Sequence, residues 1–321
     1  MYFGRGRITG SNGGLFTVQL YRTQERAPLD GMRVTGRGRG KTRRDTGLLV
    51  GDVVRVSYDA TAFSMEDGVA IPAQDGRGLS IDAIEERKNA LIRPPMANLD
   101  TIFVTVAVAS PAPLTLTVDK LISIAEHNGV TPVILLSKCD LDPVSADRLE
   151  EIYRRAGFPV FRTGEGMEEE TERLRAYLSA SAGRISAFSG ASGVGKSTLL
   201  NRLFPTLSLE TGEISARIER GKNTTRRVEL YPLEGEDVYL ADTPGFTMLD
   251  FERFDFFDKE DLPLTFREFL PYIGECRYTK CSHTKEDGCA ILAAVREGKI
   301  ARTRHQSFVS LYEVLKKKTK W

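Results

Sequence analysis

Residues 190–197 carry the clearest chemical pattern in this sequence of 321 residues. They read Gly-Ala-Ser-Gly-Val-Gly-Lys-Ser and match the full pattern G-x-x-x-x-G-K-[ST], after an apolar run and before a helical pattern. Glycines let such a loop wrap so that its backbone N–H groups point at phosphate, near a helix N-terminus that favours anions. In this motif Lys196 reaches the β- and γ-phosphates, and the Ser197 hydroxyl binds Mg²⁺. The segment therefore predicts a site for a nucleoside triphosphate with magnesium.

A second motif, Asp242-Thr-Pro-Gly245, follows the apolar stretch 238–241, which we expect to be a strand. An Asp at the end of a strand can hold the Mg²⁺ shell, and a glycine N–H can contact the γ-phosphate. The pattern D-x-x-G alone carries little weight, because residues 75–78 match it too. Its position after a strand and after the phosphate loop favours a role in the same nucleotide site.

The third motif, Ser137-Lys-Cys-Asp140, follows the apolar stretch 132–136. In loops of the form N/T/S-K-x-D, the Asp carboxylate accepts hydrogen bonds from guanine N1–H and the exocyclic amine, while the Lys lies along the base. Adenine lacks these donors, so a mismatch leaves buried polar groups unpaired. A surface turn is the alternative for the tetrapeptide alone, but the two phosphate motifs favour guanine recognition. We expect Cys139 to be a small buried filler within this loop.

The order of these motifs is unusual. In ordinary GTPases the phosphate loop comes first and the base-reading loop last, whereas here residues 137–140 precede 190–197, followed by 221–225 and 242–245. Nothing physical forbids this order, because a sheet needs each strand in place and only the connections change. The order therefore predicts a circularly permuted GTPase.

Metal-ligating residues gather near the C-terminus as Cys276-x4-Cys281-x-His283-x5-Cys289. The whole chain has only 4 Cys and 3 His, so this grouping is dense. Three Cys and one His form a full ligand set for structural zinc, with no position left open for catalysis. A disulfide among three cysteines would leave an odd thiol and ignore the histidine. We therefore predict one structural zinc ion per chain.

The elements that must position these residues divide the chain into three regions. Residues 1–72 hold short extended segments separated by turn residues, which favours a small β-barrel of the OB type. From about residue 75, apolar runs such as 102–109 alternate with helical patterns such as 118–127, which is typical of a mainly parallel α/β sheet. The last region is aromatic and acidic, then rich in Cys, and ends in a basic helix at 305–318. We predict domains at residues 1–74, 75–252 and 253–321.

Charge is unevenly distributed, although the net charge is only +1. Residues 31–55 carry a net charge of +5, largely from the Gly- and Arg-rich stretch 36–44, and residues 293–321 carry +6. Two basic ends around a more acidic middle indicate contacts with a polyanion at both ends. A solvated flexible loop is the alternative for residues 36–44 taken alone.

Composition limits the class of protein. With 41% hydrophobic and 28% charged residues, the chain has ordinary globular usage, which excludes disorder and collagen-like structure. Its apolar runs are too short to span a bilayer, and its first residues do not form a signal peptide. The few, clustered cysteines do not form a disulfide framework. We expect a reduced, cytoplasmic protein without membrane contact.

These features together resemble the RsgA (YjeQ) family of bacterial ribosome-small-subunit-dependent GTPases. Residues 86–94, Glu-Arg-Lys-Asn-Ala-Leu-Ile-Arg-Pro, and 190–200 add to a resemblance that covers essentially the whole chain. The resemblance implies an N-terminal OB-fold on ribosomal RNA. It also implies hydrolysis of GTP to GDP and phosphate, stimulated by the small subunit during its late maturation. We expect such a protein to be a monomer.

The resemblance also implies roles for single residues. Thr225, or alternatively Thr224, would be the switch residue that binds Mg²⁺ with Ser197, and Asp242 and Gly245 would form the second switch. The base-reading loop would use Ser137, Lys138, Cys139 and Asp140, and the phosphate loop Gly190, Ala191, Ser192, Gly193, Val194, Gly195, Lys196, Ser197 and Thr198.

Three positions depart from what is usual. The base-reading loop begins with Ser137 where Asn or Thr is common, but a hydroxyl can still brace the loop. Asn223 stands where the family often has His, so that position receives no catalytic role. Phe246 follows the D-x-x-G glycine where many Ras-like GTPases have a water-orienting Gln. We therefore predict slow intrinsic hydrolysis that the small subunit raises at least about tenfold.

Two other functions remain open from the residues alone. One is a GTP-sensing RNA-binding module whose hydrolysis is incidental, which turnover with and without small subunits would distinguish. The other is a P-loop ATPase or kinase with a zinc module. The Ser-Lys-Cys-Asp loop argues against the second alternative, because it is suited to guanine.

Overall fold

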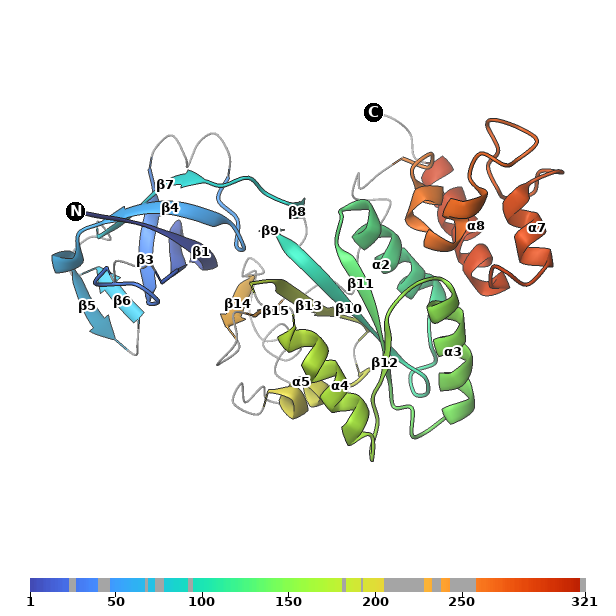
Figure 1. The fold of residues 1–321 in the computed structure, drawn as a ribbon, viewed down its shortest axis with the longest axis horizontal. Coiled ribbons are helices and arrows are strands. Elements are labelled where there is room, and N and C mark those ends of the chain that lie inside the picture. Colours follow the sequence, from blue (N-terminus) through green and yellow to red (C-terminus); the bar gives the residue numbers. More distant parts are fainter. Residues whose placement is uncertain are drawn as a thin grey trace. The chain divides into compact units, whose positions relative to one another are not determined.

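Short strands build the N-terminal part of the chain, which is drawn in blue in Figure 1. In the computed structural model these are β1 (Tyr2–Asn12), β2 (Leu15–Leu20), β3 (Arg33–Gly38), β4 (Val53–Tyr58) and β7 (Leu79–Ile84). Backbone pairing joins them in the closed ring β1-β2-β3-β7-β4-β1. The structure thus confirms the predicted N-terminal barrel.

The structure describes residues 1–22, 27–39, 47–66, 69–72, 78–91, 95–180, 183–191, 193–204, 228–232, 238–242 and 258–317. The chain divides into two compact units. The first comprises residues 1–100, 181–187 and 220–244, and the second 101–180, 188–219 and 245–321. The three domain ranges expected from the sequence stay predictions.

The sequence pattern predicts strands at residues 15–20, 32–35, 53–58 and 69–71, but it does not predict the barrel strand β1. Its glycines and arginines hide the alternation that marks a strand, yet Ile8 within it is fully buried. A Cβ on Gly6 would lie 2.6 Å from the carbonyl oxygen of Gln19 in the paired strand β2. Glycine is therefore required there by the close approach of two backbones.

Further strands extend the barrel within the first unit. The order β13 (Ile185–Ser189), β15 (Tyr239–Asp242), β14 (Glu229–Pro232) leads to β1, with β13 and β15 parallel. Opposite, β5 (Phe63–Glu66) and β6 (Val69–Pro72) form a hairpin after the short η1 (Ala60–Ala62). Two short strands, β8 (Ala90–Leu91) and β9 (Met96–Ala97), pair separately.

The second unit has the predicted parallel α/β architecture. Strands β10 (Leu99–Ala107), β11 (Thr131–Ser137) and β12 (Val160–Arg162) pair in parallel, β11 between the other two. Their apolar runs are buried, as expected for strands covered on both faces. The helices of this region are α2 (Thr115–His127), α3 (Pro143–Arg155), α4 (Glu168–Ser179) and α5 (Lys196–Leu203).

Helix α3 shows how local signals set a helix boundary. The pattern predicts a helix over 146–156, but α3 begins three residues earlier, at Pro143. Asp142 caps it, since its Oδ1 accepts a hydrogen bond from the Ser145 N–H at 3.0 Å. Pro143 at the first helical position completes a favourable start.

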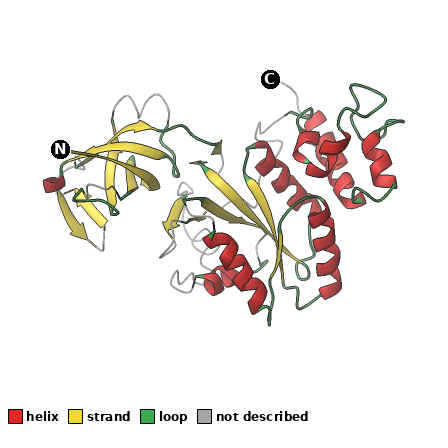
Figure 2. Cartoon of the chain, in the orientation of Figure 1, coloured by secondary structure: helices red, strands yellow, loops and turns green. Residues whose placement is uncertain are grey.

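Helices make up the C-terminal region, drawn in red in Figure 1. They are η3 (Leu262–Thr265), η4 (Arg267–Tyr272), α7 (Ala290–Arg296) and α8 (Arg302–Lys316), and Figure 2 shows no strand between residues 258 and 317. Phe266, Phe269 and Phe308 are fully buried, with ring centroids 5.0–5.4 Å apart. This aromatic cluster is the core of the region.

A buried ion-pair network joins this region to the α/β part. Arg304 of α8 pairs with Asp119 of α2 at 2.6 Å and with Glu268 of η4 at 2.7 Å, and its side chain is 1% exposed. The Tyr153 hydroxyl of α3 also donates to Asp119, at 3.2 Å. Arg304, one of the basic residues counted near the C-terminus, is therefore neutralised inside the protein and is not on its surface.

No helix among the described residues combines the length and apolar character needed to cross a membrane.

Candidate nucleotide site and metal cluster

The phosphate loop lies between β13 and α5, in the strand–loop–helix context that its motif requires. Gly190 has φ +149°, and a Cβ there would lie 2.5 Å from the carbonyl oxygen of Thr105. Gly195, at φ +93°, is the N-cap of α5, so backbone N–H groups of the first helical turn face the loop. A glycine is thus required at both ends of the turn. This arrangement suits an anion.

Lys196 is the first residue of α5, and its ammonium group folds back over the loop. Its Nζ donates to the carbonyl oxygens of Gly190 at 2.7 Å and Ala191 at 2.8 Å. Burial lowers the pKa of Lys196 below its ordinary value. A phosphate at the loop would add the opposite charge that these neutral carbonyls do not supply.

The base-reading loop is held against the phosphate loop. The Ser137 hydroxyl, at the end of β11, donates to the Val194 carbonyl oxygen at 2.6 Å, and this contact is buried. Residues 57 positions apart are therefore joined by one short hydrogen bond. This confirms that a serine hydroxyl braces the loop where Asn or Thr is usual.

Asp140 and Lys138 are oriented by neighbouring backbone. Asp140 is exposed, and its Oδ1 accepts from the Glu165 N–H at 3.1 Å. Lys138 has φ +58°, and its Nζ donates to the carbonyl oxygen of Ser110. Lys138 is half-buried, and neither charged group forms an ion pair with another described residue.

The sequence interpretation missed the segment Thr163-Gly-Glu165, which follows β12 and packs on the base-reading loop. A Cβ on Gly164 would lie 2.4 Å from Asp140 Oδ1, so only glycine allows the carboxylate its position. The Cys139 N–H donates to the Thr163 carbonyl oxygen at 3.1 Å. A glycine directly after a short buried strand was the available signal, but its partner lies 24 positions away in the sequence.

Cys139 is fully buried between these contacts, as expected for a small filler. Its Sγ donates to the Leu136 carbonyl oxygen at 3.3 Å, and burial raises the pKa of the thiol. A buried, protonated thiol is a poor nucleophile.

The remaining predicted nucleotide residues are described only in part. Ser197 is half-buried and Thr198 exposed in the first turn of α5, and Gly193 lies in the loop itself. Asp242 is the last residue of β15, which confirms the strand that was expected to precede it. The residues outside the described part of the chain are Ser192, Asn223, Thr224, Thr225, Gly245 and Phe246.

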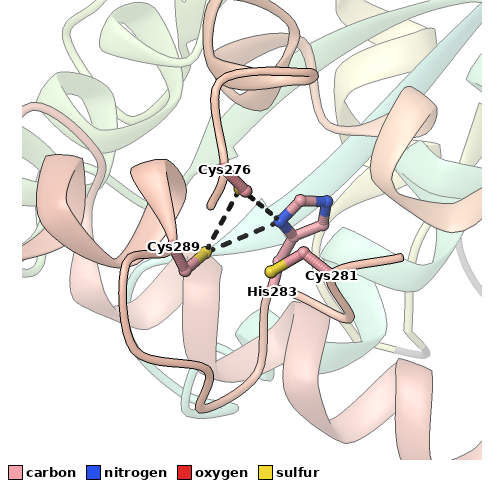
Figure 3. Close-up of side chains that lie close together, drawn as sticks. All are labelled: Cys276, Cys281, His283 and Cys289. Carbon is pink, nitrogen blue, oxygen red and sulfur yellow. Dashed lines mark hydrogen bonds between the residues drawn. The ribbon is translucent and has the colours of Figure 1, made fainter. Parts of the chain in front are cut away.

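The four predicted metal ligands converge on one point (Figure 3). Cys276 Sγ lies 3.5 Å from His283 Nδ1 and 3.8 Å from Cys289 Sγ, which is itself 3.6 Å from His283 Nδ1. With Cys281, all four ligand atoms lie within 4.8 Å of one another. A tetrahedral zinc with Zn–S bonds of about 2.3 Å holds its sulfur ligands about 3.8 Å apart. The cluster therefore has the dimensions of a zinc site.

The loop around the cluster is organised by its own hydrogen bonds. Glu286 accepts from the N–H groups of Ser282 at 2.9 Å and Thr284 at 3.2 Å. Although burial alone would raise its pKa, hydrogen bonds from the Ser282 hydroxyl and from the N–H groups of Ser282 and Lys285 lower the pKa of Glu286 to about 2. His283 has φ +59°, and its carbonyl oxygen contacts His305 Nε2 at 2.8 Å, which ties the loop to α8. These contacts order the part of the loop that carries His283.

The cysteines of the cluster must lose their protons before they can bind a metal ion, whereas the histidine need not. Burial raises the pKa of Cys281 to about 12 and lowers the pKa of His283. A neutral imidazole is the ligand form of histidine, whereas a cysteine must release its proton to bind metal.

Comparisons with known proteins agree with this geometry. The family model described as RsgA GTPase matches residues 84–252. A relative from Caldanaerobacter subterraneus, named small ribosomal subunit biogenesis GTPase RsgA, is 37% identical over 290 residues, which are 88% of this chain and 89% of the relative. A protein of the same name from Ruminiclostridium cellulolyticum is 39% identical over 258 residues, 80% of each chain.

Two solved structures are similar over nearly their whole length. YjeQ from Thermotoga maritima matches with a TM-score of 0.78 and 29% identity, covering 99% of this chain and 100% of that chain. YloQ, described as a circularly permuted GTPase, matches with a TM-score of 0.72 and 27% identity over 100% of this chain and 98% of its own. The motif order in this chain agrees with that description.

Proposed function

The chain belongs to the RsgA GTPase family, and on that premise we propose that it acts on the small ribosomal subunit. There it binds GTP and hydrolyses it to GDP and phosphate during late maturation of the subunit, which stimulates the reaction. The names of the relatives support the partner, and the motif order supports the permuted GTPase. The observation that carries the proposal is the buried hydrogen bond between Ser137 and Val194, because it places the base-reading and phosphate loops side by side.

In this proposal the base-reading loop selects guanine. Asp140 offers two carboxylate oxygens to the two donors of guanine, and Lys138 lies along the base. The Glu165 N–H holds Asp140 Oδ1 at 3.1 Å, so the carboxylate is oriented before the nucleotide binds. Preorganised acceptors lose less free energy on binding than mobile ones.

The phosphate loop, residues 190–198, supplies backbone N–H groups and the Lys196 ammonium to the triphosphate. Lys196 stabilises negative charge that develops on the transferred phosphoryl group. Ser197 and Thr225 would hold magnesium, which bridges the β- and γ-phosphates when bound. Asp242 would support the magnesium shell, and Gly245 would contact the γ-phosphate through its N–H.

We further propose that Cys276, Cys281, His283 and Cys289 bind one zinc ion per chain. The ligand atoms of Cys276, His283 and Cys289 lie 3.5–3.8 Å apart, and all four lie within 4.8 Å of one another. Three thiolates with one imidazole leave no open position. The ion would stabilise the loop between η4 and α7 and would not take part in hydrolysis.

Contacts with ribosomal RNA are proposed at the N-terminal barrel and the C-terminal helix. Arg37 of β3 is exposed and continues into the basic stretch 36–44, of which residues 40–44 lie outside the described part. Arg39 is also exposed but pairs with Asp82 at 3.2 Å, so part of its charge is already matched. The protein would act as a monomer in the cytoplasm.

The proposal is tested by nucleotide preference and by turnover. Asp140→Asn should weaken GTP binding and shift preference towards xanthine nucleotides, because an amide can donate to the xanthine carbonyl. GTP turnover of the wild type should rise at least about tenfold when small subunits are added. Equal affinity of the wild type for ATP and GTP would contradict guanine recognition, and turnover indifferent to subunits would contradict the proposed partner.

A further inference from the structure

A small cleft lies between α3 and the start of α8, within the second unit. Its volume is about 250 Å³, and its lining includes Arg148, Glu151, Arg155 and Arg302. The residues come from two helices separated by over a hundred positions in the sequence. Ligand pockets for whole drug-sized molecules span roughly 300–1,000 Å³. This cleft therefore suits a single small group and not a nucleotide.

The charges in this cleft are unequally matched. Arg155 pairs with Glu151 one turn earlier on α3, and it donates to the Gly298 carbonyl oxygen at 2.8 Å. Arg148 and Arg302 are exposed, and neither forms an ion pair or hydrogen bond with the described residues. Because Glu151 pairs with Arg155, the charges of Arg148 and Arg302 are the two in the lining that no described residue matches.

The position of Arg302 is unfavourable for the free protein. It is the first residue of α8, whose first turn contains no acidic residue and whose N-cap, Ala301, offers no side-chain acceptor. A cation at a helix N-terminus opposes the helix dipole. Arg304 lies in the same turn, but Asp119 and Glu268 balance its charge. No described residue does this for Arg302, so its charge is not balanced within the described part of the chain.

We propose that this arginine cleft binds a phosphate of the RNA backbone. Planar guanidinium groups match phosphate oxygens in paired hydrogen bonds, and three of them line a space of suitable size. The unpaired N–H groups of the first turn of α8 add donors on one wall. The inference rests on the proposed function only for its RNA, which would belong to the small ribosomal subunit.

The first test measures binding to small subunits with a non-hydrolysable GTP analogue over a range of salt concentrations. Arg148→Gln with Arg302→Gln should lower the slope of log affinity against log salt by about one, because one phosphate contact is lost. Intrinsic GTP hydrolysis should stay at the wild-type rate. The matched control, Arg173→Gln with Arg175→Gln on α4, removes the same charge elsewhere in the unit, from one exposed and one half-buried helical arginine. Equal slopes for both double variants would overturn the proposal.

A charge reversal separates binding from a structural role. Arg302→Glu places an anion at the helix N-terminus, so it should raise the thermal midpoint of the free protein while weakening subunit binding. A residue needed only for folding would lower the midpoint instead. A higher midpoint with unchanged subunit binding would overturn the proposal.

A third experiment uses the free protein without ribosomal subunits. It can therefore test the cleft independently of the proposed function. A short single-stranded RNA should shift the Nε–H resonance of Arg302 in the wild type, and inorganic phosphate should do so more weakly. Neither the RNA nor inorganic phosphate should shift the Nε–H resonance of Arg173. A shift with an acidic peptide and none with RNA would overturn the assignment. If the wild type shows the RNA shift but does not bind small subunits, the cleft stands and the proposed function fails.

Discussion

The metal cluster and the nucleotide loops are built in opposite ways. The ligands of the cluster are half-buried or buried, and the region carrying them is fastened by an aromatic core and the Arg304 network. Lys196 and Asp140, in contrast, are partly exposed and contact mainly backbone groups of neighbouring loops. The four side chains of the cluster face one another, whereas Lys196 and Asp140 contact backbone groups that a bound ligand could replace. We therefore expect changes in the cluster to affect mainly stability, and changes in the nucleotide loops to affect mainly turnover.

Loss of a metal ligand should have the largest effect of all. Structural zinc sites contribute folding free energy on the order of 10 kcal/mol, so Cys281→Ser should release the ion and loosen the region from η4 to α7. GTP binding should remain close to that of the wild type, because no hydrogen bond or ion pair joins the described residues of the nucleotide loops to the cluster. Metal analysis and limited proteolysis would measure both effects.

Cys139→Ala serves as the control for that variant, because it removes the one cysteine outside the cluster. Its zinc content should equal that of the wild type. A chelator-free preparation of the wild type without zinc would contradict the proposed site.

Breaking the buried Arg304 network, which joins the C-terminal region to helix α2, should have the next largest effect. Arg304→Met leaves two carboxylates buried without a counter-charge, which typically costs about 3–5 kcal/mol. Burial alone would lower the pKa of Arg304, but Asp119 and Glu268 raise it, so the wild-type side chain stays charged. Urea denaturation would give the free energy of unfolding.

The matched control combines Arg304→Met with Asp119→Asn and Glu268→Gln, which removes all three charges together. This triple variant should recover much of the lost stability. An equally unstable triple variant would show that packing of Arg304 on the Phe266 ring, and not charge, dominates.

Lys196→Ala tests the region built for turnover. Among the described residues its ammonium group donates only to two loop carbonyl oxygens, so its loss should leave the fold intact. Hydrolysis should fall at least about a hundredfold, with and without small subunits, because a charge that stabilises the transition state is removed. Single-turnover assays would measure it, with Lys259→Ala as a surface control. Near-normal hydrolysis by the variant would remove Lys196 from the mechanism.

Ser137→Ala should have the smallest effect of these variants. It tests whether the hydrogen bond between the two nucleotide loops contributes to GTP affinity. Loss of the bond to the Val194 carbonyl oxygen should cost about 1 kcal/mol, or roughly fivefold in GTP affinity. Ser137→Thr keeps the hydroxyl and should bind GTP like the wild type. Titration with a fluorescent GTP analogue would distinguish them, and identical affinity of all three proteins would mean that the loops are positioned by other contacts.

Sequence patterns were reliable where the determining residues are neighbours in the chain. The phosphate loop needs its glycines and Lys196 within a single turn, and the four metal ligands lie within residues 276–289. Apolar runs gave the buried parallel strands, because a strand covered on both faces must be apolar throughout. The motif order also gave the permutation, since it depends only on succession along the chain.

The tertiary structure alone decided which distant groups meet. No local pattern distinguishes Arg302, which is exposed in the cleft, from Arg304 two residues later, which is 1% exposed beside Asp119. Likewise, Gly164 becomes indispensable only because Asp140 of another loop lies against it. The reason is physical: a side chain's charge and burial depend on the partners that packing brings to it, and those partners lie far away in sequence. The sequence by itself determined the chemistry of each segment, and packing determined its surroundings.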